Sequence, residues 1–285
     1  MMQFPRTEVE GLSLSRMIIG SNWMAGYSHR SPSADRMIVE RHSTTKNLVP
    51  MLETFQEYGV DTIMALFSQH PVIVQAIREA SEKTGKEFIL VDTPIINVDD
   101  SAAARAEAKA IIQKSREIGS KICLIHHSSA EQLVNKNKRT MDRLDDYTYM
   151  IREAGMIPGL SAHMPELIVY SDLNGYDVQT YIQIYNCMGF LMQVEVETVN
   201  QIIHDAKKPV MTIKPMAAGR TTPFVGLNFN WATLRDCDMV TVGCFNEHEA
   251  REDIEISLAA LERRRVNIEK RSSPNQKQDA FGGNQ

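Results

Sequence analysis

The chain has 285 residues, 43% of them hydrophobic and 24% charged, which is the composition of a globular protein with one large core. A net charge of −5 and a pI near 5.9 argue against a nucleic acid or an anionic membrane as the main partner. No apolar run approaches the roughly 20 residues that span a bilayer, the amino-terminal segment is too polar for a signal peptide, and the four cysteines form no CxxC pair. We therefore expect a cytoplasmic protein with no membrane partner.

Apolar, β-rich runs alternate with helical patterns along most of the chain. Eight of the runs have the near-continuous apolar character of parallel strands that are buried on both faces. The pattern predicts an α/β fold, a (β/α)8 TIM barrel, which usually needs about 250 residues. No GxGxxG follows the first strand, so an open dinucleotide-binding sheet has no support. The predicted strands are Arg16–Gly20, Val60–Leu66, Glu87–Asp92, Lys121–His126, Ile157–Ala162, Tyr181–Tyr185, Val210–Lys214 and Met239–Val242.

Helical patterns of ordinary length separate these strands. Four of them are followed by a glycine, which favours the left-handed conformation that closes many helices. The predicted helices are Asn47–Tyr58, Pro71–Thr84, Ala102–Ile118, Thr140–Ala154, Pro165–Leu173, Val196–Ala206, Pro223–Leu234 and Glu247–Arg264.

The barrel is expected to form a single domain over residues 1–270. The polar segment Gln3–Ser15 predicts a short hairpin that closes the bottom of the barrel. The connection from Ser21 to Ser43 predicts a long loop over the active-site face, because loops above about 12–15 residues are usually functional or disordered. Residues 271–285 contain few apolar side chains and are expected to form a disordered tail.

Polar residues stand where the predicted strands end, and barrel enzymes build their chemistry at these carboxyl ends. His126, His163 and Asp92 close neighbouring strands, and two imidazoles with a carboxylate are suitable ligands for Zn, Mn or Fe. His126 or His163 could equally be a metal-free general acid or base, or a structural residue that hydrogen bonds within the rim. His127 is expected to face the opposite side of its strand and to pack under the next helix.

Lys214 ends the seventh predicted strand and is expected to point into the mouth of the barrel. A lysine there can form a Schiff base, stabilise an enolate or bind an acid group. The structural alternative is an ion pair with Asp92, Glu195 or Glu197.

Further residues near the strand ends are candidates for substrate contact. The segment after Lys214 opens a helix with backbone donors, two hydroxyls and a guanidinium, which suits an anionic group such as a phosphate. The alternative is a simple N-cap by Thr222. The predicted substrate-binding residues are Asn22, Trp23, Ser161, Tyr185, Asn186 and Arg220.

The order and the residues of several segments resemble those of the aldo-keto reductase family. The matching segments are Gly11–Gly20, Leu124–His127, Gly159–His163, Lys214–Gly219 and Val242–Glu249. The resemblance implies a TIM barrel with an amino-terminal hairpin. It also implies hydride transfer from NADPH with a catalytic tetrad of Asp, Tyr, Lys and His.

Most of that tetrad has no counterpart in this sequence. His126 takes the histidine position, but one alignment places Met64 at the aspartate and Gln69 at the tyrosine. The other alignment uses Asp61 as the aspartate and then places Leu66 at the tyrosine. No lysine ends the third strand. Because a phenol acid and its lysine partner are both missing, reduction with NADPH is not expected.

The sequence therefore predicts a non-redox enzyme, a lyase, isomerase or hydrolase, that acts on a small polyhydroxylated or carbonyl compound such as a sugar or sugar phosphate. His126 would be the acid/base or metal ligand, His163 its partner, and Lys214 the electrophilic or anion-stabilising group. One alternative is a divergent NAD(P)H-dependent oxidoreductase, and another is an inactive barrel that binds a ligand or partner. A homo-oligomer is compatible with either.

Overall fold

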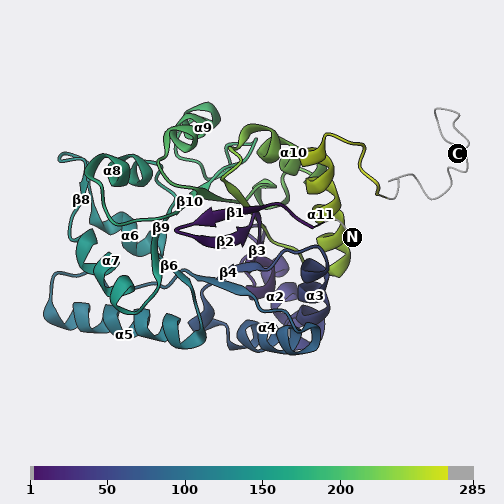
Figure 1. The fold of residues 1–285 in the computed structure, drawn as a ribbon, viewed down its shortest axis with the longest axis horizontal. Helices are drawn as coiled ribbons and strands as arrows, with labels where there is room; N and C mark the ends of the chain where they lie inside the picture. The colour runs from purple at the N-terminus through teal and green to yellow at the C-terminus, as the bar shows by residue number, and fades with distance from the viewer. Residues whose placement is uncertain (1–2, 269–285) are drawn as a thin grey trace, which may run out of the picture.

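The fold is a closed barrel of eight parallel strands with helices around it (Figure 1). The computed structural model describes residues 3–268, so the predicted tail, residues 271–285, lies outside the described residues. The eight strands follow one another around the ring, and the last pairs with the first, which confirms the predicted (β/α)8 barrel. They are β3 (Met17–Gly20), β4 (Thr62–Ala65), β5 (Ile89–Asp92), β6 (Ile122–Ile125), β9 (Ile157–Ala162), β10 (Tyr181–Ile184), β11 (Val210–Ile213) and β12 (Met239–Val242).

Each barrel strand places alternate side chains inside the barrel and outside it, under the helices. The interior cluster and the outer cluster are both apolar, so the strands are buried on both faces. The interior is filled by one or two side chains from most strands: Ile18, Met64, Val91, Ile122, Leu124, Ile182, Met211 and Met239.

The predicted amino-terminal hairpin is present as β1 (Arg6–Val9) and β2 (Leu12–Ser15), which pair antiparallel. Figure 1 shows it lying across the ring of strands. Val9 and Leu14 are buried in the interior cluster, so the hairpin fills the amino-terminal end of the barrel. The Arg6 guanidinium forms an ion pair with Asp61 at 2.8 Å, just before β4 begins.

The predicted helices are found between the strands, two of them with the predicted bounds. Helix α7 begins later than predicted, because the residues before it form a small hairpin of β7 (Val134–Asn135) and β8 (Thr140–Met141). Within residues 3–268, no helix is both long and apolar enough to cross a bilayer. The helices from residue 45 onward are α3 (Leu48–Glu57), α4 (Pro71–Thr84), α5 (Ala102–Ile118), α6 (His127–Ala130), α7 (Leu144–Glu153), α8 (Glu166–Asn174), α9 (Val196–Asp205), α10 (Pro223–Thr233) and α11 (Glu247–Glu262), with single turns η1 (Thr45–Asn47), η2 (Phe67–Gln69), η3 (Glu131–Leu133) and η4 (Ala217–Gly219).

The segment from Ser21 to Ser43 is largely helical, and the prediction of a long loop there was wrong. It contains α1 (Asn22–Ala25) and α2 (Pro32–Arg41). Ser31 caps α2, since its side chain accepts a hydrogen bond from the Ala34 N–H at 3.2 Å, and Pro32 occupies the first turn. The Ser-Pro pair is a recognisable helix start, so the sequence carried this signal.

Candidate active site at the carboxyl end of the barrel

A cavity of about 430 Å³ opens where the barrel strands end. Its wall contains four histidines and Lys214, and no aspartate or glutamate occurs among the described residues that line it. The residues that line the cavity include Trp23, Tyr27, His29, Met64, Leu66, Gln69, Thr93, His126, His127, Ser161, His163, Ile213 and Lys214.

Lys214 lies in this cavity, as predicted from its place after β11. Ile213 precedes Lys214, and both side chains line the cavity. In a regular strand, consecutive side chains point to opposite faces, so only one of the two could do so. The backbone of Lys214 is left-handed, with φ of 62°, and this turn brings the second side chain inward. A non-glycine residue in this conformation is strained, a feature that concentrates at functional sites.

The Lys214 ammonium has no ion pair and no hydrogen bond from its Nζ to any residue between positions 3 and 268. The alternative of an ion pair with Asp92, Glu195 or Glu197 is therefore not realised. Burial lowers the pKa of Lys214 to about 8, because the charged form loses hydration that no carboxylate replaces. With a pKa of about 8, about a tenth of this amine is unprotonated at pH 7.

His126 follows β6 and lines the cavity. Its Nδ1 lies 2.8 Å from the Ser128 hydroxyl and accepts the Ser128 backbone N–H at 3.3 Å. Burial, together with charge repulsion from His127 and Lys214, lowers the pKa of His126 to about 4. An Nδ1 that accepts a backbone N–H places the ring proton of the neutral imidazole on Nε2.

His127 lies in the same cavity, and the prediction that it packs under a helix was wrong. The strand ends at Ile125, and His127 is the first residue of α6, so strand alternation no longer sets its direction. Its ring stacks on the His163 ring with centroids 3.7 Å apart and lies 4.2 Å from the His126 centroid. The three imidazoles therefore form one continuous group.

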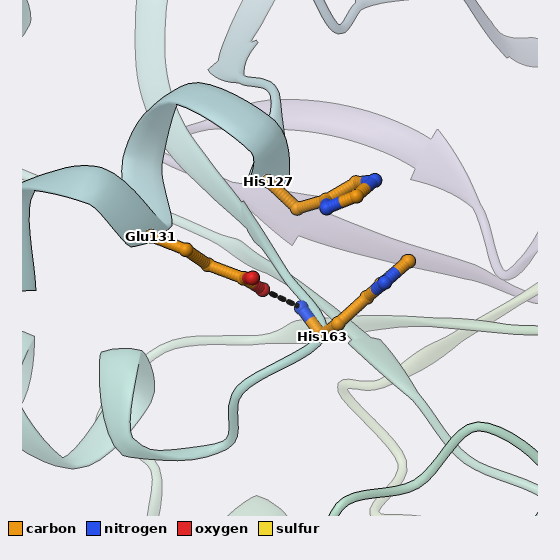
Figure 2. A group of neighbouring side chains, drawn as sticks. All are labelled: His127, Glu131 and His163. Carbon is orange, nitrogen blue, oxygen red and sulfur yellow. Dashed lines mark hydrogen bonds between the residues drawn. The ribbon is translucent and has the colours of Figure 1, made fainter. Parts of the chain in front are cut away.

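His163 follows β9 and lines the cavity beside His127. Burial, together with charge repulsion from His127 and Lys214, lowers the pKa of His163 to about 3. The backbone N–H groups of His163 and Met164 donate to Oε1 of Glu131, at 2.7 and 3.0 Å. Glu131 thus ties the end of β9 to the helical segment that carries His127 (Figure 2).

Asp92 is not part of this site, which corrects the predicted metal set of His126, His163 and Asp92. Val91 faces the barrel interior, so Asp92 faces outward, where it is fully buried. Its Oδ1 accepts the backbone N–H groups of Phe67 and Thr93 at 3.2 and 2.9 Å. Burial raises the pKa of this carboxyl, and a hydrogen bond from Ser115 of α5 opposes the rise.

Three of the predicted substrate-binding residues, Asn22, Trp23 and Ser161, line the cavity. Tyr185 does not, because it lies on the outer face of the barrel after β10. It is buried there, accepting a hydrogen bond from Asn200 and donating one to Thr233, both at 2.9 Å.

Asn186 and Arg220 also lie outside the cavity lining. The Asn186 side chain is buried and folds the following loop, with Oδ1 accepting the Phe190 N–H at 2.9 Å. Arg220 is exposed and its guanidinium stacks on the Phe190 ring at 3.7 Å. Thr222 caps α10 by accepting the Val225 N–H at 3.4 Å, so the N-cap alternative for this segment is realised.

Two cavity residues that the sequence analysis did not select come from the segment between α1 and α2. Tyr27 and His29 both line the wall. Burial lowers the pKa of His29, and the Lys214 charge lowers it further. Trp23 and His42 contact the Phe245 ring with centroids 6.1 and 5.5 Å away, which fixes both ends of this segment against the loop after β12, the strand that neighbours β3.

The structure also distinguishes the two alignments with the reductase tetrad. Met64, Gln69 and His126 line one cavity, as the first alignment requires. Asp61, which the second alignment uses, lies at the opposite end of the barrel in its ion pair with Arg6. The cavity thus has methionine and glutamine where the family has aspartate and tyrosine.

Comparison with known proteins shows a likeness in fold. A Pseudomonas aeruginosa protein described as an aldo-keto reductase superposes with a TM-score of 0.64 at 13% identity, over 90% of this chain and 95% of that one. The aldose reductase from Giardia lamblia gives 0.54 at 11% identity, over 94% and 96%. No protein-family model matches the chain, and its sequence matches no curated protein significantly. The barrel is aldo-keto reductase-like.

Proposed function

We propose that this protein is a non-redox enzyme, a lyase or isomerase, that binds a small carbonyl compound through an imine to Lys214. The observation that carries the proposal is a lysine amine without an anionic partner, in a cavity whose described lining has no carboxylate. An unprotonated amine in a partly apolar pocket is the form of lysine that attacks carbonyl carbon.

The proposed reaction is balanced without an external oxidant or reductant. The unprotonated Lys214 amine adds to the carbonyl carbon, and the adduct takes up one proton from water in the cavity and loses one water to leave a protonated imine. The imine then draws electrons from a bond at the adjacent carbon to give an enamine. If a C–H bond breaks, its proton passes to water in the open cavity. If a C–C bond breaks, the leaving carbon becomes a carbonyl as its hydroxyl proton passes to water. Protonation of the enamine and hydrolysis by one water then release the product and restore the amine.

His126 is proposed to orient the carbonyl group. Its Nδ1 is engaged by Ser128, so Nε2–H is the ring group available to donate to a carbonyl oxygen in the cavity. Asn22, Trp23 and Ser161 are proposed as substrate contacts because they share the lining. This wall of hydroxyl, amide and aromatic groups suits a polyhydroxylated carbonyl compound such as a sugar or sugar phosphate.

Reductive trapping tests the proposal. The full-length protein is incubated with sodium borohydride and a panel of pyruvate, glyceraldehyde and dihydroxyacetone phosphate, and the adduct is located by peptide mass spectrometry. We expect a single stable adduct, on Lys214, with at least one probe. Absence of any adduct, or adducts spread over exposed lysines without preference for Lys214, would reject the imine.

A second candidate, NAD(P)H-dependent reduction, is favoured by the likeness of the barrel to aldo-keto reductases. It lacks the phenol and lysine of the family, since Gln69 and Thr93 stand in the wall instead. Tyr27 is the phenol in the wall that could replace the lost acid. Quenching of NADPH fluorescence at micromolar protein, followed by turnover of a simple aromatic aldehyde, would establish this function, and we expect neither.

A further inference from the structure

We infer that His127, Glu131 and His163 form a binding site for one divalent transition-metal ion. Their ligand atoms all lie within 4.8 Å of one another. Figure 2 shows the three side chains around a common gap, with His127 and Glu131 on one helical segment and His163 at the end of β9. The ion site itself does not depend on the imine to Lys214; only the identity of its oxygen ligand rests on the proposed function.

The local structure explains why the three residues meet. α6 and η3 follow each other without a break, and His127 and Glu131 are four residues apart, which places them on the same side of a helical turn. β9 is the neighbour of β6 in the barrel, so its last residues arrive beside the start of α6. The hydrogen bonds from the His163 and Met164 N–H groups to Glu131 fix this approach.

The donor set is free to bind an ion. Glu131 uses Oε1 for the two backbone N–H groups, and its Oε2 has no hydrogen bond to the described residues. Neither the His127 nor the His163 ring nitrogens have a hydrogen bond within residues 3–268, whereas Nδ1 of His126 is engaged by Ser128. Two imidazoles and one carboxylate suit Zn²⁺, Fe²⁺, Co²⁺ or Mn²⁺.

The ligand atoms lie up to 4.8 Å apart, farther than they would around a bound ion, so they must move together on binding. Ligand atoms around tetrahedral Zn²⁺ lie about 3–3.5 Å apart, given bond lengths of about 2.0–2.2 Å. Ligand atoms at the 4.8 Å limit would therefore move together by about 1.3–1.8 Å on binding. The two rings are half-buried and stacked, so side-chain rotation is the movement that would bring the ligand atoms together.

His127 and His163 line the cavity, so the remaining coordination positions of the ion face the space that receives the substrate. The ligand class that this geometry selects is an oxygen donor, such as a hydroxyl or carboxylate, on the same small compound that Lys214 holds. The ion would fix that oxygen, while Lys214 engages the carbonyl carbon.

Metal titration of the full chain, after treatment with a chelator, tests the site. Isothermal titration with Zn²⁺ and the visible spectrum with Co²⁺ are each expected to show one ion per chain. His127→Ala and His163→Ala should weaken binding by more than about 100-fold, because even residues that only support a ligand contribute about 10–100-fold. Glu131→Gln keeps an acceptor for the two backbone N–H groups and should also weaken binding.

His126→Ala is the matched control, since it removes a histidine from the same cavity that the proposed site does not use. It should keep the affinity of the wild type, as should Lys214→Met, which separates this site from the imine. Thermal unfolding of each apo variant identifies any that fails to fold. No binding by the folded wild type, full binding by folded His127→Ala or His163→Ala, or loss of binding in folded His126→Ala would overturn the assignment.

Discussion

A buried charge at the amino-terminal end of the barrel is paired, whereas the lysine in the cavity at the carboxyl end is not paired in the part of the chain that the structure describes. At the amino-terminal end, charged side chains are paired: Arg235 forms an ion pair with the buried Asp238 at 2.7 Å, and Arg152 with Glu10 at 2.6 Å. At the carboxyl end, Lys214 has no such partner within residues 3–268. The contrast separates an end built for stability from an end that keeps its polar groups free for a ligand.

β11 connects the two ends and shows the same contrast over a few residues. Lys208 lies before the strand, and its Nζ donates a hydrogen bond to Gln179 at 3.0 Å. Lys214 lies after the strand, in the cavity. The two lysines therefore provide a matched pair for experiments on the two ends.

The largest expected effect is on imine formation. Lys214→Met should abolish borohydride trapping and any turnover, because the amine that forms the imine is removed. Lys208→Met should trap the same probes at the wild-type level. Peptide mass spectrometry of both variants provides the measurement, and equal trapping by the two would contradict the assigned difference between the ends.

The next largest expected effect is a loss of stability when a buried charge is removed at the amino-terminal end of the barrel. Asp238→Ala should lower the free energy of unfolding by about 3–5 kcal/mol, because it leaves the Arg235 charge poorly compensated. Asp238 is fully buried and its Oδ1 also accepts the Val210 N–H at 2.9 Å. Urea unfolding measures the loss, while trapping per folded molecule should be retained. An unchanged free energy of unfolding would show that the Arg235–Asp238 ion pair does not stabilise the barrel.

A somewhat smaller loss is expected from the hairpin. Leu14 is fully buried in the interior cluster, so Leu14→Ala removes apolar contacts and leaves a cavity at the bottom of the barrel. Such changes cost about 2–5 kcal/mol. Thermal and urea unfolding should both show the loss, with the Lys214 adduct still formed. A loss of trapping in the folded protein would show that the two ends are coupled.

The smallest expected effect is a pH dependence of stability, whose direction follows from the lowered pKa of Lys214. Its pKa is about 8 in the folded state against 10.5 as the ordinary value, so the folded state binds the proton less tightly. The charged lysine therefore destabilises the fold below pH 8, and this penalty disappears as the pH rises from 8 to 10.5. Lys214→Met should be more stable than wild type at pH 7 by about 1–3 kcal/mol.

The measurement for this pH effect is urea unfolding of wild type and Lys214→Met between pH 7 and pH 10. The difference in unfolding free energy should shrink as the pH rises. A difference that stays constant over this range would show that the lysine amine is already well hydrated or paired in the folded protein.

Much of the fold could be predicted from local patterns. The alternation of apolar runs and helices gave the eight strands and their order, and Lys214, His126 and His163 were chosen because they follow strands. Strand ends meet at one edge of a parallel barrel, so this inference needs no knowledge of side-chain direction. The helix α2 was missed although Ser31 and Pro32 signal its start.

The direction of each strand-end side chain could not be predicted in the same way. Asp92 and Tyr185 were chosen for the site, but both face outward and are buried. In a strand exposed on one face, polar residues would mark the outside. These strands are apolar on both faces, so their sequence does not distinguish the interior from the helix side.

The sequence by itself therefore determined the barrel, the order of its elements and the set of positions at its mouth, because these depend on local apolar periodicity and on parallel strand ends meeting at one edge. Only the tertiary structure decided which of those positions face the cavity. The left-handed turn at Lys214 brings its amine inward, and the start of α6 at His127 stacks that ring on His163. Both depend on how the backbone leaves a strand, which is fixed by packing against neighbouring elements.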